Sequence, residues 1–425
     1  MKLNYKRTFF IGLAFLSICA FWQLYDNIVP LILSEHFNLN ETWTGVIMAL
    51  DNVVALFLLP FFGTLSDKTH TRLGKRTPFI LTGTIISVIV MVLLPIFTNM
   101  NSFVPFVISL GVLLISMGIY RSPAVALMPD LTPKPLRSKA NAVINLMGAL
   151  GGIITLLFIS VLIPKTSLPD YTMVFIAVGI LMLVSVTVLV LTINENRLAK
   201  EIHIDDEDDA DEAELSTADG KMDKAVKKSL IFILLSVFLW YTAYNAVTTA
   251  FSRYARNVWG LEGGGFANCL LVATGAAVIS YIPFGFIAGK FGRKKTILLS
   301  IVFTLISYGA ACLFTEFSSW MYVLFAIIGI GWAGINVNSY PMVVEMSKGS
   351  DIGKYTGLYY TFSMAAQVFT PIFSGFLFEK FSFKILFPYA VFFSVIAFIT
   401  MSMVKHGDSK PIKKESALEH FDFDD

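Results

Sequence analysis

Apolar runs of about 20 residues recur along the whole chain, each separated from the next by a short polar segment. A helix that crosses a bilayer core of roughly 30 Å needs about 20 apolar residues, and lipid offers its backbone no hydrogen-bond partners. The pattern therefore predicts an all-α membrane protein. We place its twelve spans at 9–33, 43–62, 79–97, 103–128, 140–163, 171–193, 229–252, 266–288, 296–314, 319–344, 355–377 and 384–404.

The longest polar segment divides these spans into six and six. It contains an acidic run between Asp205 and Glu214, which cannot bury enough apolar surface to fold, so we expect a solvated linker. The predicted organisation is a six-helix bundle over 1–193, an acidic cytoplasmic linker over 194–228, a second bundle over 229–404 and a cytoplasmic tail over 405–425.

Composition agrees with lipid as the solvent: 56% of the residues are hydrophobic, 15% are charged and the mean hydropathy is +0.71. A soluble protein usually carries about 25% charged residues. A net charge of +2 gives no basis for binding nucleic acid. The three cysteines show no metal-ligand spacing, and the chain has no phosphate-binding glycine loop. We therefore expect neither an enzyme nor a cofactor or metal site.

Basic residues predict the orientation. With the N-terminus in the cytoplasm, 26 of the 32 Lys and Arg residues fall on the inner side and five on the outer side. This asymmetry satisfies the positive-inside rule, so we expect both termini in the cytoplasm and the chain in the cell (plasma or inner) membrane. Arg121 is left over inside a span.

The loops after the second and the eighth span, at corresponding places in the two halves, are similar in sequence. Both loops, 63–76 and 285–295, are short, basic and rich in glycine. Parallel repeats of this kind are typical of transporters, whose substrate site lies near the membrane midplane between the repeats.

The first of these loops carries a more specific pattern: Gly63, Ser66, Asp67, Arg72, Gly74, Lys75, Arg76, Pro78, Phe79 and Ile80. It resembles the signature loop of the major facilitator superfamily, and in its full length the sucrose/proton symporter branch. It resembles the melibiose-type sugar:cation symporters more loosely. In the fourth span, Pro123, Ala126, Asp130 and Leu131 also resemble the sucrose branch. The resemblance implies the twelve-helix major facilitator fold, transport of a sugar or glycoside with a proton, and a monomer.

Three positions depart from these families. Val125 stands where the sucrose branch has its span-four arginine, and Leu114 where it has an acid. Leu59 stands where the melibiose type has an acid before the proline of the second span. The families' cation sites therefore do not carry over residue by residue.

Charged residues at the cytoplasmic helix ends are candidates for a gate. Arg72 or Arg76 can pair with Asp130, because a guanidinium can donate two parallel hydrogen bonds to a carboxylate. Such pairs would hold the inner side shut and break when the halves rock, although the same charges could serve only to fix the topology. The candidate gate residues are Gly63, Asp67, Arg72, Gly74, Arg76 and Asp130.

Three charges lie within predicted spans, where each costs roughly 3 kcal/mol or more. Asp26 and Asp51 flank a short outer loop almost symmetrically, which places them at similar depth on adjacent helices. Two carboxylates so placed disfavour joint ionisation, which suits a site that takes up a proton or another cation. We expect Arg121 in the same cavity; the alternative is three independent buried groups.

Substrate recognition should use hydrogen-bonding side chains beside aromatic faces. The candidates are Trp22, Gln23, Tyr25, Asn27, Asn141, Asn145, Trp240, Tyr244, Asn245, Asn336, Asn338, Tyr360 and Gln367. Aromatic residues at helical spacing also serve as packing, and buried asparagines join helices.

The sequence thus predicts a secondary active transporter whose partners are the lipid bilayer, a small polar solute such as a sugar or glycoside, and a proton or other cation. The alternatives are a facilitator or proton-coupled antiporter of another solute, such as a drug or organic acid, and a membrane sensor that does not transport.

Overall fold

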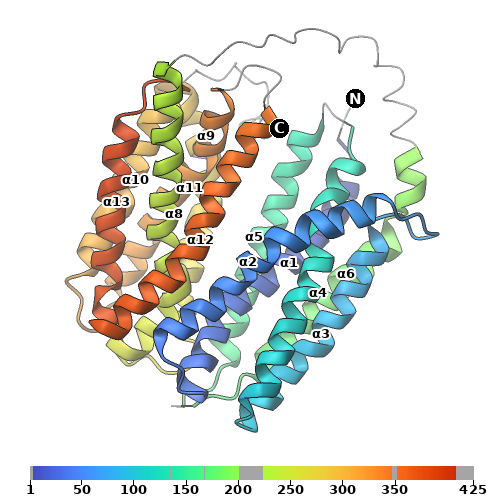
Figure 1. The fold of residues 1–425 in the computed structure, drawn as a ribbon, viewed down its shortest axis with the longest axis horizontal. Helices are drawn as coiled ribbons and strands as arrows, with labels where there is room; N and C mark the ends of the chain where they lie inside the picture. The colour runs from blue at the N-terminus through green and yellow to red at the C-terminus, as the bar shows by residue number, and fades with distance from the viewer. Residues whose placement is uncertain (1–2, 134–135, 167, 201–223, 347–351, 408–425) are drawn as a thin grey trace. The chain divides into compact units, whose positions relative to one another are not determined.

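The structure is a computed structural model that describes residues 3–133, 136–166, 168–200, 224–346 and 352–407. Twelve helices in these ranges are long and apolar enough to cross a membrane, which confirms the predicted fold class. In chain order the elements are α1 (Tyr5–Leu31), the π-helical turn η1 (Ile32–His36), α2 (Glu41–Asp67), α3 (Thr77–Asn99), α4 (Phe103–Asp130), α5 (Arg137–Leu162), α6 (Thr172–Thr192), α8 (Lys224–Trp259), α9 (Ala267–Phe291), α10 (Arg293–Ala311), α11 (Trp320–Val344), α12 (Ile352–Lys380), the 3-10 turn η4 (Phe383–Ile385) and α13 (Leu386–Ser402) (Figure 1).

Helix α8 is longer at both ends than its predicted span of 229–252. It begins at Lys224 and ends at Trp259. Charged residues such as Lys227 and Arg253 end the apolar run from which the span was predicted, but Lys and Arg are good helix formers, so the helix continues through them. The end of the predicted linker 194–228 is therefore helical. The acidic run at 205–214 lies outside the described residues.

The chain forms two compact units. Unit 1 consists of Met1–Leu39, Leu50–Glu214 and Glu262–Ala267, and unit 2 of Asn40–Ala49, Leu215–Leu261 and Asn268–Asp425. Helix α2 is thus shared, since its first residues cluster with unit 2 and the remainder with unit 1. The expected division at 1–193 and 229–404 stays a prediction.

The helices pack in the same order within each unit. In unit 1, α1 packs against α5 and α6, and α3 packs against α4 and α6. In unit 2, α8 packs against α12 and α13, and α10 packs against α11 and α13. Each of these five helices of unit 1 therefore has a counterpart six spans later in unit 2, and this packing matches the repeat indicated by the loops.

Glycines set the distance between α1 and α5. A Cβ atom on Gly151 would overlap the backbone carbonyl of Leu16, and one on Gly12 would lie 2.7 Å from Cγ of Met147. Small residues let membrane helices approach closely, and this contact keeps α1 in place beside α5.

We predict that Gly151→Ala destabilises the protein by about 2 kcal/mol, because the added methyl group meets the backbone of α1. Gly111→Ala in α4 is the control, since nothing lies within 4 Å of the added atom. The apparent melting temperature in detergent should fall only for Gly151→Ala, and equal values for the two variants would contradict the prediction.

Candidate functional site

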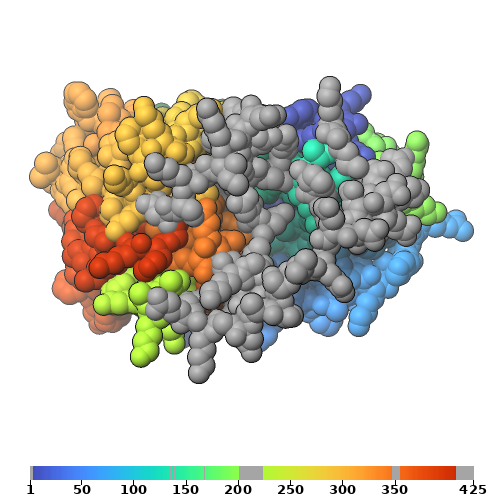
Figure 2. All heavy atoms as spheres, turned by 90° about the horizontal axis from the view of Figure 1, so that it is seen from above, coloured from blue at the N-terminus to red at the C-terminus, as the bar shows by residue number. Residues whose placement is uncertain are grey.

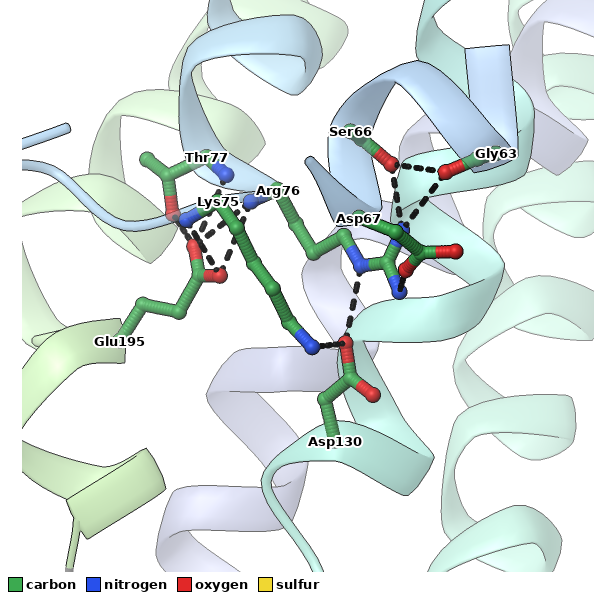
Figure 3. Close-up of polar contacts among 8 residues, drawn as sticks. All are labelled: Gly63, Ser66, Asp67, Lys75, Arg76, Thr77, Asp130 and Glu195. Carbon is green, nitrogen blue, oxygen red and sulfur yellow. Dashed lines mark hydrogen bonds and ion pairs between the residues drawn. The ribbon is translucent and has the colours of Figure 1, made fainter. Parts of the chain in front are cut away.

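Arg76, at the start of α3, forms the centre of a polar cluster at one end of unit 1 (Figure 3). Its side chain is buried, and its Nε donates to Oδ2 of Asp130 at 2.8 Å. Its Nη1 donates to the carbonyl of Gly63 at 3.2 Å and to Oγ of Ser66, and its Nη2 pairs with Asp67. One guanidinium therefore joins the ends of α2, α3 and α4.

The carboxylate of Asp130 has a second cation. Nζ of Lys75 lies 3.1 Å from the Oδ2 atom that accepts from Arg76. The sequence left open whether Arg72 or Arg76 pairs with Asp130, and the partner is Arg76. Arg72 instead contributes its backbone carbonyl, which accepts from Nδ2 of Asn196 at 3.1 Å.

Glu195 is a member of this cluster that the sequence did not indicate. It follows α6, is only 2% exposed, and accepts from the backbone N–H groups of Lys75 at 2.8 Å, Arg76 at 2.9 Å and Thr77 at 2.9 Å. Oγ1 of Thr77 donates to it at 2.7 Å. A carboxylate at a helix N-terminus satisfies donors without intrahelical partners and complements the helix dipole.

The geometry of the loop explains why residue 74 is a glycine. Its φ of +121° favours glycine, and a side chain there would overlap that of Glu195. Residues of this loop, in light blue, and those that follow α6, in light green, lie side by side at the end of unit 1 (Figure 2). The N-cap residue of α3, Arg76, makes no side-chain capping hydrogen bond, and Glu195 supplies the acceptor instead.

Unit 2 contains a corresponding ion pair. Arg293, at the start of α10, pairs with Glu345, which follows α11. Since α10 and α11 correspond to α3 and α4, this pair stands where Arg76 and Asp130 stand in unit 1. Gly292 precedes it with a φ of +94°.

The three charges within the spans lie near one another in unit 1. Asp26 of α1, Asp51 of α2 and Arg121 of α4 act on one another electrostatically. The guanidinium carbon of Arg121 lies 5.4 Å from the centre of the Trp22 ring, within the range of a cation–π interaction. Nδ2 of Asn52 donates to Oδ1 of Asp51 at 2.7 Å.

Several polar atoms beside these charges have no partner among the described residues. They are Nε1 of Trp22, the hydroxyl of Tyr25 and Oδ1 of Asn27, all buried. Nδ2 of Asn27 donates to the carbonyl of Gln23 at 2.9 Å, within α1. Unsatisfied polar groups in a buried site indicate where a ligand or a rearrangement can supply the missing hydrogen bonds.

An aromatic cluster, defined here as Tyr241, Tyr244, Trp332 and Tyr359, occupies unit 2. The rings of Tyr244 and Trp332 are stacked, with centroids 3.7 Å apart and planes at 3°. The rings of Tyr241 and Trp332 are perpendicular, with centroids 5.2 Å apart, and the Tyr241 hydroxyl lies 3.5 Å from that of Tyr359. Oγ of Ser339 lies 2.9 Å from the Tyr359 hydroxyl. Of these four residues, Tyr244 is among the candidates predicted from the sequence, whereas Tyr241 and Trp332 are not.

The other predicted candidates differ in exposure. Nδ2 of Asn338 donates to the carbonyl of Gly334 at 2.8 Å, so this buried amide is bound within its own helix. Nε1 of Trp240 and Nδ2 of Asn245 have no partner among the described residues. Asn141, Asn336 and Gln367 are half-buried, whereas Asn145 and Tyr360 are exposed.

Comparisons with known proteins give a family match, a relative that matches part of the chain, and two structures of similar fold. The sequence pattern of the family described as "MFS/sugar transport protein" matches residues 10–351. The chain is 27% identical over 139 residues to "Sucrose transport protein SUC3" of Arabidopsis thaliana, a stretch that covers 28% of this chain and only 23% of that protein. A mutant of the nucleoside transporter NupG is similar in fold, with a TM-score of 0.69 at 14% identity, over 95% of this chain and 100% of that chain. A POT family transporter in complex with 5-aminolevulinic acid has a TM-score of 0.68 at 11% identity, over 94% and 95% of the two chains.

We predict that Glu195→Ala lowers the stability by about 2 kcal/mol, because it leaves buried N–H groups of the loop and of α3 without an acceptor. Glu316→Ala, which removes an exposed glutamate, should leave the apparent melting temperature in detergent unchanged. A Glu195→Ala protein as stable as this control would show that the cap is dispensable.

Proposed function

The chain belongs to the MFS/sugar transport protein family, and we propose that it is a proton-coupled symporter of a sugar or glycoside that works by alternating access. Membership of this family confirms the resemblance carried by the loop at 63–80, and it makes the chain a membrane-embedded secondary transporter. The sugar, the proton and the direction of coupling are the proposal.

The group of Asp26, Asp51 and Arg121 carries the proposal. With both carboxylates ionised, these side chains have a net charge of −1, and one bound proton makes them neutral. A net charge removed from water costs several kcal/mol, so the conformations that close this site off from water favour the protonated form. Proton uptake is thereby coupled to the conformational cycle.

Polar atoms without a hydrogen-bond partner lie beside the proposed proton site, where they can bind the solute. Nε1 of Trp22 and the hydroxyl of Tyr25 lie on α1 beside Asp26. A solute hydroxyl that bonds to them contacts the helix that carries the titrating carboxylate. The family description and the partial match to a sucrose transport protein support a sugar as the solute.

The Arg76 cluster is proposed as part of a gate on the cytoplasmic side. It joins the ends of α2, α3 and α4 through Asp67 and Asp130, and these ion pairs must loosen if those ends are to separate. With this assignment both termini lie in the cytoplasm, and we propose a monomer in the plasma or inner membrane.

We predict that Asp26→Asn abolishes accumulation driven by a proton gradient. In proteoliposomes with an inward gradient of one pH unit, one-to-one coupling allows up to about tenfold accumulation of the transported sugar. The variant should reach a ratio near one while it still exchanges labelled for unlabelled sugar. The assay uses a panel of mono- and disaccharides, glycosides and cationic dyes, with alkalinisation of the medium as the second readout.

Asp170→Asn, in an exposed loop, is the matched control and should behave as the wild type. Efflux of dyes without sugar uptake would favour the antiporter, and the absence of any flux would favour a sensor. Undiminished accumulation by Asp26→Asn would contradict the assignment of the coupling residue.

A further inference from the structure

The aromatic cluster of unit 2 leaves part of its surface uncovered. Tyr241 and Tyr244 are half-buried on α8, and Trp332 is half-buried on α11 with Asn336 one turn later. Residues three and four apart lie on one face of a helix. The stacked side chains of Tyr244 and Trp332 therefore keep part of their surface uncovered, on neighbouring faces of α8 and α11.

Two buried donors stand on the same half of α8. Nε1 of Trp240 and Nδ2 of Asn245 have no acceptor among the described residues, and the side chain of Trp240 is only 3% exposed. Trp240 lies one turn from Tyr244, and Asn245 one turn from Tyr241. A buried donor without a hydrogen-bond acceptor costs free energy, and the N–H group of a buried Trp side chain usually has a partner. These donors indicate a ligand that supplies acceptors beside the rings.

The cluster lies in uncharged stretches of helix. Helix α8 contains no Asp, Glu, Lys or Arg between Lys228 and Arg253, and α11 contains none over its whole length, Trp320–Val344. An ionised group bound here would be removed from water without a counter-charge on either helix, which is costly. The ligand moiety that fits is therefore neutral, with an apolar face for the rings and acceptors around its edge.

We propose that the neutral ring of a glycoside binds against Tyr244 and Trp332, with its hydroxyl oxygens accepting from Asn245 and Trp240. The C–H face of a pyranose or an aromatic aglycone matches the ring surface, and the ring hydroxyls match the donors. The inference rests on the proposed function for the identity of the solute as a sugar or glycoside. It adds that Trp332 determines the specificity and that uronic acids and other organic acids are excluded.

The test measures equilibrium binding by calorimetry to the purified full chain in detergent, which requires no proton gradient. The probes are phenyl glycosides of the common hexoses, and for each hexoside that binds, the corresponding phenyl uronide, which differs by a carboxylate at C6. We expect the uronide to bind at least 100-fold more weakly. Equal affinities would overturn the proposal, as would a panel in which no neutral glycoside binds.

Variants at two tryptophans of α11 assign the site. Trp332→Ala should weaken binding of the neutral glycoside by tenfold or more, and Trp332→Phe, which keeps a planar ring, by less. Trp320→Ala removes an exposed indole, 68% accessible, at the start of the same helix and should change nothing. Size-exclusion profiles identify any variant that fails to fold, and Trp332→Phe then carries the test.

Unchanged affinity in both folded Trp332 variants would overturn the proposal. Its failure is distinguishable from that of proton coupling. If Asp26→Asn still accumulates sugar but Trp332→Ala loses binding, the coupling residue is wrong and the binding surface stands. If coupling depends on Asp26 while the glycoside and its uronide bind equally, the coupling residue is right and the proposed binding surface is wrong.

Discussion

A charge or a backbone N–H group that is removed from water must find a partner inside the protein, and this constraint organises the polar features of the molecule. The buried guanidinium of Arg76 is satisfied by two carboxylates, a carbonyl and a hydroxyl from α2 and α4. The N–H groups at the start of α3 are satisfied by Glu195, which follows α6. Because the partners of α3 come from α2, from α4 and from the segment after α6, their pairing holds the ends of four helices together.

The two units meet this constraint with opposite chemistry at corresponding places. In unit 1 an anion in the segment after α6, Glu195, accepts from N–H groups at the start of α3 and of the turn before it. In unit 2 the first turn of α10 supplies the cation: Nζ of Lys294 donates to the carbonyls of Ser402 at 2.8 Å and Val404 at 2.5 Å, at the end of α13. The repeat therefore preserves the attachment between the third and sixth helices and not the residues that make it. The same divergence leaves the intramembrane charges in unit 1 and an uncharged aromatic cluster in unit 2.

Much of the fold follows from local pattern. The twelve spans, the pairing of Asp130 with an arginine of the loop and the proximity of Asp26 to Asp51 follow from runs, spacing and depth along single helices or adjacent pairs. Other features had no local signal. Glu195 reads as the first acid of a polar linker, yet it is buried against residues nearly 120 positions earlier. Trp332 reads as one more aromatic residue in an apolar run, and only the approach of α11 to α8 places it on Tyr244.

Hydropathy and charge along the chain are sufficient to predict the solvent, the number of spans, the repeat and the residue types available for pairing, because each of these depends on one helix turn or one helix length. Helix packing selects the arginine that pairs with Asp130, the acid that caps α3 and the rings that stack, because these contacts depend on the relative depth and rotation of helices far apart in the chain. A helix rotated by one residue, about 100°, presents a different set of side chains to its neighbour. No run of apolar residues specifies that rotation; the packing of glycines such as Gly151 against a neighbouring backbone does.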